Sequence, residues 1–281
     1  RHNIEVLAKL RSIDREALTT ADRLNYDLFL KDYKESIEGY DYGWHLIPLN
    51  QRGGIQTANE LADALRFETL KDYEDWLARL RAFPAYMDQT IALMREGIKT
   101  RMILPKVVLG RIPTQLDHQI VDDPKTSPFY KPFTHFHASI SQADRSRLAL
   151  AAENEIVASI VPAFRKLKQF FIEDYLPAAR DREGVWQLPQ GEAMYSFAAR
   201  QHTTTNLTPK EIHEVGLSEV SRIRAEMQTI IDKLGFKGSF ADFAAFLRTD
   251  PQFYYRTPEE LLEAYRALTR RIDPLLVKVF K

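Results

Sequence analysis

The sequence contains no cysteine, which excludes disulfide bonds, thiolate zinc ligands and cysteine nucleophiles. Glycine is also scarce, at 11 of 281 residues, or about 4%, against a usual share of roughly 7%. Few glycines mean few tight turns, so this composition favours long helices over a meander of short strands.

Excess charge of either sign and long apolar runs are missing too. Lysine and arginine together number 39, as do aspartate and glutamate, so nothing attracts the chain to nucleic acid or to anionic lipid. No apolar run approaches the roughly 18–20 residues needed to span a membrane, so the sequence predicts no membrane-spanning segment.

The first residues, Arg1 to Ile4, are neither a signal peptide nor a translation start. We therefore expect the chain to begin inside a longer protein.

Helix starts recur as a hydroxyl residue followed three positions later by an acid, a pattern that satisfies free amides of the first turn. The strongest example is Thr208, with Pro209 at the first helical position and Glu211 as the acid. Apolar residues then recur every three or four positions to Leu234, and Gly235 follows as a left-handed cap. This pattern predicts a helix over 208–234.

The same signals predict an all-α fold, a single body of long antiparallel helices over 1–281 with at most a minor β element. Pro84 and Pro162 are expected to separate or kink helices. The only short strand candidates are 44–49 and 185–188, and loops gather at 50–54, 122–128 and 180–190. The helices are predicted over 4–12, 20–38, 57–66, 70–82, 85–102, 105–121, 142–176, 208–234, 239–248 and 258–280.

No residue pattern in the chain predicts a metal site or a catalytic group. His213-Glu214 begins the helical zinc motif, but Leu217 occupies the position of the second histidine ligand. His135 and His137 lie among aromatic residues without a nearby acid, and are more typical of a packed loop than of a metal site. His118 follows Asp117 in a predicted helix, where adjacent side chains diverge by about 100°.

The segment 195–206 is the best candidate for a binding site. It places Tyr195, Arg200 and His202 before a run of threonines at 203–205 and the start of the predicted 208–234 helix. A guanidinium suits a carboxylate, and free amides at a helix start suit a carboxylate or a peptide carbonyl. The candidate substrate-binding residues are Arg200, His202, Thr203, Thr204 and, ranked lower, Tyr195. These residues would equally serve a turn that satisfies its own hydrogen bonds.

A family resemblance extends this interpretation over essentially the whole chain. The sequence resembles the bacterial family catalogued as domain of unknown function 885. The segments that carry the resemblance are Arg200–Leu217, Glu219-Val220, Ile223–Met227, Phe240–Phe243, Leu247–Tyr254, Thr257–Leu262 and Met94–Gly97.

The resemblance implies a mostly helical, cleft-bearing zinc metallopeptidase, often exported or anchored by lipid at the bacterial envelope, although a cytoplasmic location stays open. In that family the histidine and glutamate zinc ligands lie downstream of the matched region. The chain is therefore expected to be the N-terminal half of such a protein, with peptide substrate and the C-terminal half as partners. Zinc is expected in the full-length protein and no cofactor in this part of it.

Two other functions compete with this interpretation. One is a stand-alone helical binding module that recognises a partner through a groove between helices. The other, less favoured, is an independent enzyme that uses His135, His137 or His202. If the chain is one half of a cleft, an apolar face should stay exposed on the 258–280 helix. The residues of that face are Leu261, Leu262, Tyr265, Leu268, Ile272, Leu275, Leu276 and Val279.

Overall fold

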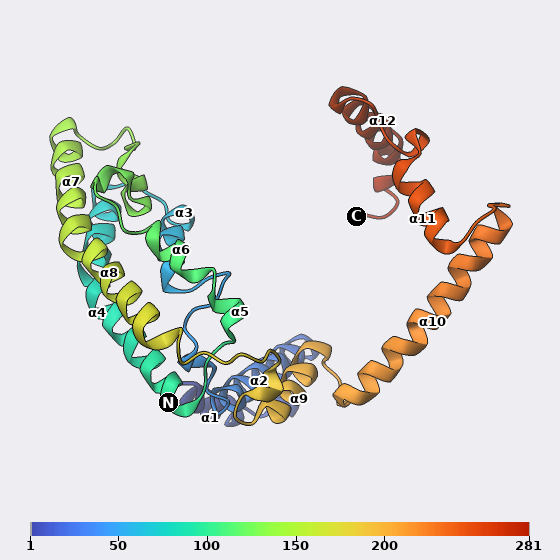
Figure 1. Ribbon diagram of the computed structural model, residues 1–281, viewed down its shortest axis with the longest axis horizontal. Helices are drawn as coiled ribbons and strands as arrows, with labels where there is room; N and C mark the ends of the chain where they lie inside the picture. Colours follow the sequence, from blue (N-terminus) through green and yellow to red (C-terminus); the bar gives the residue numbers. More distant parts are fainter. Residues whose placement is uncertain (1, 281) are drawn as a thin grey trace. The chain divides into compact units, whose positions relative to one another are not determined.

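The computed structural model describes residues 2–280, and its chain divides into two compact units, Arg1–Asn206 and Leu207–Lys281 (Figure 1). Both units are built from helices. Within residues 2–280 the only β-type pairings are two isolated bridges, Asn50 with Gly53 and Pro105 with Arg180. The all-α prediction is therefore confirmed, while the prediction of one domain over 1–281 stays a prediction.

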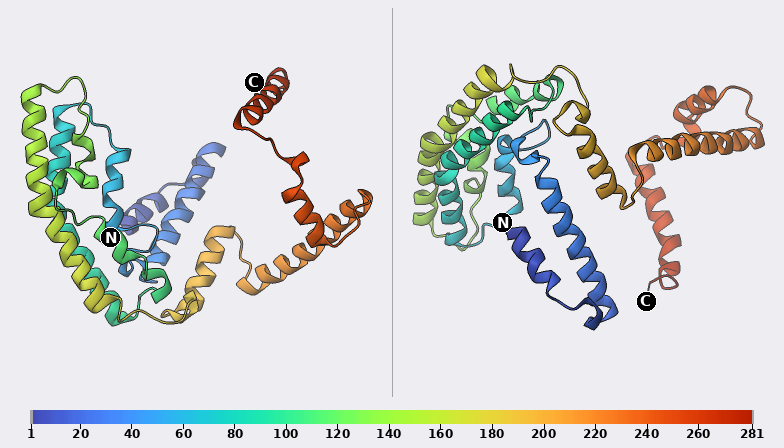
Figure 2. Two further views of the ribbon diagram at one scale, coloured as in Figure 1. Left: turned by 45° about the horizontal axis from the view of Figure 1, so that its top comes forward. Right: turned by 90° about the horizontal axis from the view of Figure 1, so that it is seen from below.

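Three long elements form the body of the first unit. Helix α4, Leu70–Thr100, packs side by side with α7, Gln142–Glu155, and α8, Val161–Phe170 (Figures 1 and 2). The π-helical turn η6 (Ile156–Ile160) joins α7 to α8, and a second one, η7 (Phe171–Tyr175), extends α8, so that one helical run covers 142–175. The expected helix over 142–176 is thus present. Pro162 does not break it, because a proline without an N–H fits beside a wide turn.

Shorter elements complete the first unit. Helices α1 and α2 pack against each other as a hairpin (Figure 2), and α9 contacts α2. The helices are α1 (His2–Arg11), α2 (Thr20–Tyr40), α3 (Leu61–Ala64), α5 (Lys106–Leu109), α6 (Ile112–Asp117) and α9 (Gly191–Thr203). The short 3₁₀ turns are η1 (Arg15–Ala17), η2 (Trp44–Leu46), η3 (Ile55–Glu60), η4 (Pro124–Thr126), η5 (Pro128–Phe133) and η8 (Val185–Gln187).

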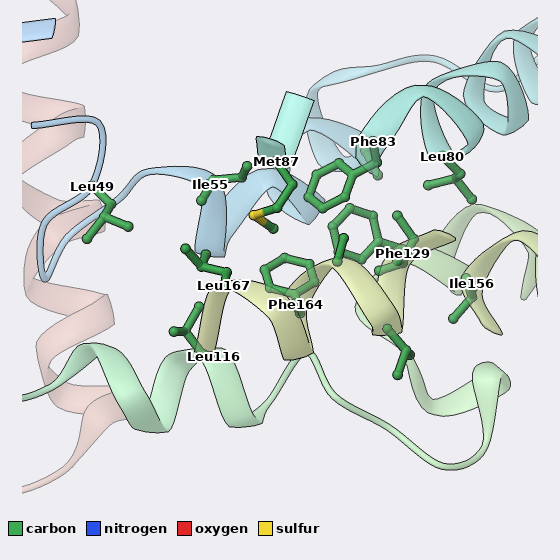
Figure 3. Packing of buried hydrophobic residues seen from close by; sticks show 14 of the residues in the cluster. Leu49, Ile55, Leu80, Phe83, Met87, Leu116, Phe129, Ile156, Phe164 and Leu167 are labelled. Atoms are coloured by element: carbon green, nitrogen blue, oxygen red, sulfur yellow. The ribbon is translucent and has the colours of Figure 1, made fainter. Parts of the chain in front are cut away.

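The core of the first unit lies between α4, α8 and the turns that cover them (Figure 3). At its centre the rings of Phe83, Phe129 and Phe164 gather, with centroids 5.3–6.0 Å apart. Aromatic pairs at such distances add to the stability gained from burial alone. The indole N–H of Trp76 donates to the carbonyl oxygen of Phe129 at 3.1 Å and so ties η5 to α4. This core holds the first unit together.

The second unit contains α10 (Pro209–Lys233), α11 (Phe240–Thr249), η9 (Pro251–Phe253) and α12 (Pro258–Leu276). Local signals start its helices: the Glu211 N–H donates to Thr208 Oγ1 at 3.2 Å, and the Thr208 N–H donates to Glu211 Oε2 at 2.7 Å. Gly235 has φ +65°, which confirms the left-handed cap predicted after α10.

Among the described residues of the second unit, Ile231 alone is a buried hydrophobic residue. The eight apolar residues predicted to form an exposed face on the 258–280 helix are between 41% and 76% exposed, so that prediction is confirmed. Large apolar residues of α10 are exposed as well. They are Val215, Leu217, Val220, Ile223, Met227 and Ile230. Exposed apolar surface of this extent is typical of an interaction site.

Pro84 does not separate two helices, contrary to the sequence prediction. Helix α4 runs through it without interruption, although the proline has no N–H to donate to the carbonyl four residues earlier. Leu80 and Phe83 before the proline and Met87 after it are all buried in the same core. Packing on both sides of Pro84 therefore outweighs the lost hydrogen bond.

Several other boundaries were predicted wrongly. The expected helix 105–121 is two short helices, because Gly110 and Pro113 interrupt it. The expected helix 57–66 begins with the 3₁₀ segment η3, because the Thr57 hydroxyl donates to the Gly54 carbonyl at 3.2 Å instead of capping a helix. Both strand candidates, 44–49 and 185–188, contain 3₁₀ turns, and the helix over 258–280 ends at Leu276.

Tyr175 places a hydroxyl in the core without a hydrogen-bond partner among the described residues. Burial raises the pKa of Tyr175 to about 12. An unpaired buried hydroxyl costs roughly 1–3 kcal/mol, so we expect Tyr175→Phe to leave the free energy of unfolding unchanged or to raise it by about 1 kcal/mol. Urea denaturation followed by circular dichroism measures the change.

Tyr73 is the matched control for this substitution. It is equally buried, but its hydroxyl donates to the Phe67 carbonyl and accepts from the His137 N–H, both at 3.1 Å. Tyr73→Phe should therefore lower the free energy of unfolding by about 1 kcal/mol. Equal losses in both variants would contradict the assignment of an unpaired hydroxyl at Tyr175.

Candidate functional site

The segment 195–206 is helical over most of its length, because it belongs to α9, a helix that the sequence analysis did not predict. Helix α9 begins at Gly191, where a Cβ atom would lie 2.1 Å from the Val185 carbonyl oxygen. Only glycine allows that close approach of the two backbones. The candidate residues are thus carried by a regular helix and not by a loop that precedes one.

Arg200 lies on the face of α9 that packs against α2. Its Nη2 atom is 2.6 Å from Glu38 Oε1, and its guanidinium lies over the Phe197 ring at 5.4 Å. The hydrogen bond to Glu38 raises the pKa of Arg200 above its ordinary value. A Cβ atom at Gly39 would lie 3.2 Å from the Phe197 ring, so α2 and α9 approach closely here. Arg200 therefore has a partner within the chain.

Tyr195 and His202 share the other side of α9. They are seven positions apart, which is close to two full helical turns, whereas His202 is rotated by about 200° from Arg200. Both side chains are exposed, Tyr195 at 53%. The structure therefore brings Tyr195 and His202 onto one accessible face and separates them from Arg200. The sequence analysis ranked Arg200 and His202 together, and it placed Tyr195 below them.

The threonines end helix α9. Thr203 Oγ1 donates to the Ala199 carbonyl at 2.8 Å and lies 2.9 Å from Thr205 Oγ1, while Thr204 is left-handed with φ +55°. A helix end of this kind presents carbonyl groups, which favour positive and not negative charge. The start of α10 is already occupied by the Glu211 carboxylate. Neither helix end is thus a vacant carboxylate site.

His135 and His137 have local partners. His135 Nδ1 lies 3.1 Å from Thr134 Oγ1, and His137 Nδ1 lies 2.9 Å from Ser139 Oγ. Across residues 2–280, no group of three histidine, aspartate or glutamate side chains is arranged to hold a metal ion. The predicted aromatic surroundings are present, since Phe136 packs on Tyr73 with ring centroids 5.0 Å apart.

Sequence reasoning missed a cavity in the first unit that is lined by α4, η3 and η5. The one signal for it was the pair Gly53-Gly54, which the sequence analysis treated only as a loop. Gly54 has φ +143°, and a Cβ atom there would lie 2.6 Å from Leu49 Cβ. Only glycine fits this position, where the backbone forms part of the cavity wall.

The fold of this chain is similar to that of a protein of known structure. Over 97% of the chain, the fold is similar to a crystal structure titled "putative lipoprotein from Colwellia psychrerythraea", with a TM-score of 0.75 and 20% sequence identity. At that identity the likeness shows the fold alone. The match covers 50% of the other protein, so this chain spans about half its length. No curated protein matches the chain.

No helix within residues 2–280 combines the length and the apolar character needed to cross a membrane. A family match extends over residues 1–281, the whole length of the chain, and its description is "Bacterial protein of unknown function (DUF885)". The chain therefore belongs to the DUF885 family of bacterial proteins.

Proposed function

We propose that this chain is the helical N-terminal part of a zinc-dependent peptidase and forms one wall of its substrate cleft. The resemblance of the sequence to metallopeptidase-like members of the family supports the activity. The half-length match to a larger protein of the same fold supports a further, C-terminal half. Peptide substrate would bind between the two halves.

The exposed apolar faces of α10 and α12 are the observation that carries this proposal. Large side chains such as Met227, Ile230 and Leu268 are 44%, 55% and 46% exposed, respectively. Burial of each such side chain stabilises a fold by roughly 1.5–3 kcal/mol, so an isolated domain gains little from leaving them in water. The C-terminal half would cover these faces.

The described residues do not fit a zinc ion, since they contain no cluster of potential ligands. We therefore assign no catalytic or metal-binding residue to this chain, and propose that the zinc ligands and the general base belong to the C-terminal half. The task of this chain would be to bind and orient the peptide, with His202 and Tyr195 on the accessible face of α9 and with Arg200 exchanging Glu38 for a substrate carboxylate. The similar structure is titled a lipoprotein, which favours the bacterial envelope as the location.

The test compares the full-length protein with the 1–281 chain. After dialysis, we expect elemental analysis to find about one zinc per full-length protein and none bound stoichiometrically to the 1–281 chain. The full-length protein should cleave peptides and lose that activity to a chelator, whereas the 1–281 chain should be inactive. Tightly bound zinc in the 1–281 chain would contradict the proposal. A metal-free full-length protein that binds a partner without cleaving peptides would favour a binding module.

A further inference from the structure

The first unit contains a cavity of about 450 Å³ that lies apart from α9. A volume of this size is within the range of small-molecule sites, which is roughly 300–1,000 Å³. One wall is a face of α4, and the opposite walls come from η3, α3 and η5. The lining includes Leu61, Trp76, Arg79, Phe83, Tyr86 and Phe129.

The deep part of the cavity is rigid and aromatic. Trp76, Phe83 and Phe129 are at most 7% exposed and belong to the main core, where Figure 3 shows Phe83 and Phe129 next to each other. Tyr86 and Leu61 are 54% and 43% exposed and form the rim. Faces of aromatic rings favour a flat apolar group over a strongly hydrated one. The cavity walls therefore favour an aromatic or other apolar body.

Arg79 supplies the one charged group of the lining. The other basic residues of α4 all have partners: Lys71 pairs with Asp75, Arg81 with Glu155 and Lys99 with Glu96, and Arg95 lies over Phe170. Among the described residues, no carboxylate pairs with Arg79, which is exposed. A guanidinium beside an apolar cavity suits a carboxylate, because its planar donors match the two carboxylate oxygens.

We propose that this cavity binds a small aromatic carboxylic acid, with the ring beside Leu61 and Tyr86, above the floor that Trp76, Phe83 and Phe129 form, and with the carboxylate on Arg79. The apolar walls account for the ring, and the unpaired charge at the rim accounts for the acid. This site contains none of the α9 residues proposed to bind peptide and does not depend on peptidase activity.

Tryptophan fluorescence reports binding directly, because Trp76 lines the cavity while Trp44 and Trp186 are 44% and 65% exposed elsewhere. In a chain with Trp44→Phe and Trp186→Phe, titration with 3-phenylpropionate should change the Trp76 emission and saturate. The uncharged 3-phenylpropanamide, which has the same shape, should bind at least about tenfold more weakly, the difference expected for one charge-assisted contact.

Two variants and one control separate the possible outcomes. Arg79→Gln should weaken binding of the acid to the level of the amide and leave the amide unchanged. Ala82→Phe, at an exposed position of the lining, should narrow the cavity without adding a second tryptophan and weaken binding of both probes while the thermal melting temperature is kept. Lys71→Gln removes the same charge from α4 outside the cavity and should have no effect. Equal binding of acid and amide, or no saturable binding of the acid, would overturn the proposal.

Discussion

Phe164→Ala is expected to lower the free energy of unfolding of the first unit by about 3–5 kcal/mol, the usual cost of removing a fully buried phenylalanine side chain. Phe164 has no exposed surface, and its ring contacts both Phe83 and Phe129 at the centre of the core. The substitution leaves a cavity between α4 and α8 that close-packed neighbours fill only in part. Guanidinium denaturation followed by circular dichroism measures the loss.

Ile172 is the control for this prediction, since it follows α8 by two residues and is 45% exposed. Ile172→Ala should cost about 1 kcal/mol or less, because most of the lost surface already contacts water. Similar losses at Phe164 and Ile172 would show that the core is not organised around the phenylalanine cluster.

The second large effect concerns peptide turnover by the full-length protein. His202→Ala and Arg200→Ala are each expected to lower kcat/KM by one to three decades with little change in melting temperature, if each residue makes a charge-assisted contact to the substrate. The measurement is steady-state cleavage of peptides together with a thermal melt. His213, an exposed histidine on α10, is the control, and His213→Ala should keep wild-type turnover.

Glu38→Gln tests whether Arg200 serves the substrate or the fold. If Arg200 leaves Glu38 to bind a substrate carboxylate, weakening their ion pair should preserve or raise kcat/KM. If Arg200 only holds α9 on α2, Glu38→Gln and Arg200→Ala should produce the same small loss of stability, because exposed ion pairs contribute roughly 0–1 kcal/mol. Wild-type turnover of His202→Ala would remove His202 from the site.

The sequence predicts the second unit best because its helices depend on local signals. The prediction of 208–234 differs from the observed Pro209–Lys233 by a single residue at each end, and 239–248 is similarly close to α11. Their capping residues, Thr208 with Glu211 and Ser239 with Asp242, act within three positions of each other. Such capping pairs can be recognised in the sequence without knowledge of the rest of the fold.

In the first unit, distant contacts override local signals. Helix α4 continues through Pro84 because residues on both sides of it pack into one core, and α9 forms where Gly191 meets a carbonyl from another turn. The sequence suggests Arg200 as a binding residue for a substrate carboxylate. Its carboxylate partner within the chain is Glu38, which lies 162 positions earlier in the sequence. The pairing of distant residues has no signature in a short window of sequence, and the cavity beside Arg79 has only the pair Gly53-Gly54.

The scarcity of buried side chains in the second unit would couple its folding to the proposed C-terminal half. Ile231 is the only buried hydrophobic residue described there, so packing within the unit contributes little to its stability, and the apolar surface of α10 and α12 holds most of what burial could supply. A surface that binds only the folded form shifts the folding equilibrium by mass action. If the proposed C-terminal half covers these faces, its affinity would contribute to the thermodynamic stability of the helices, and docking would be coupled to folding.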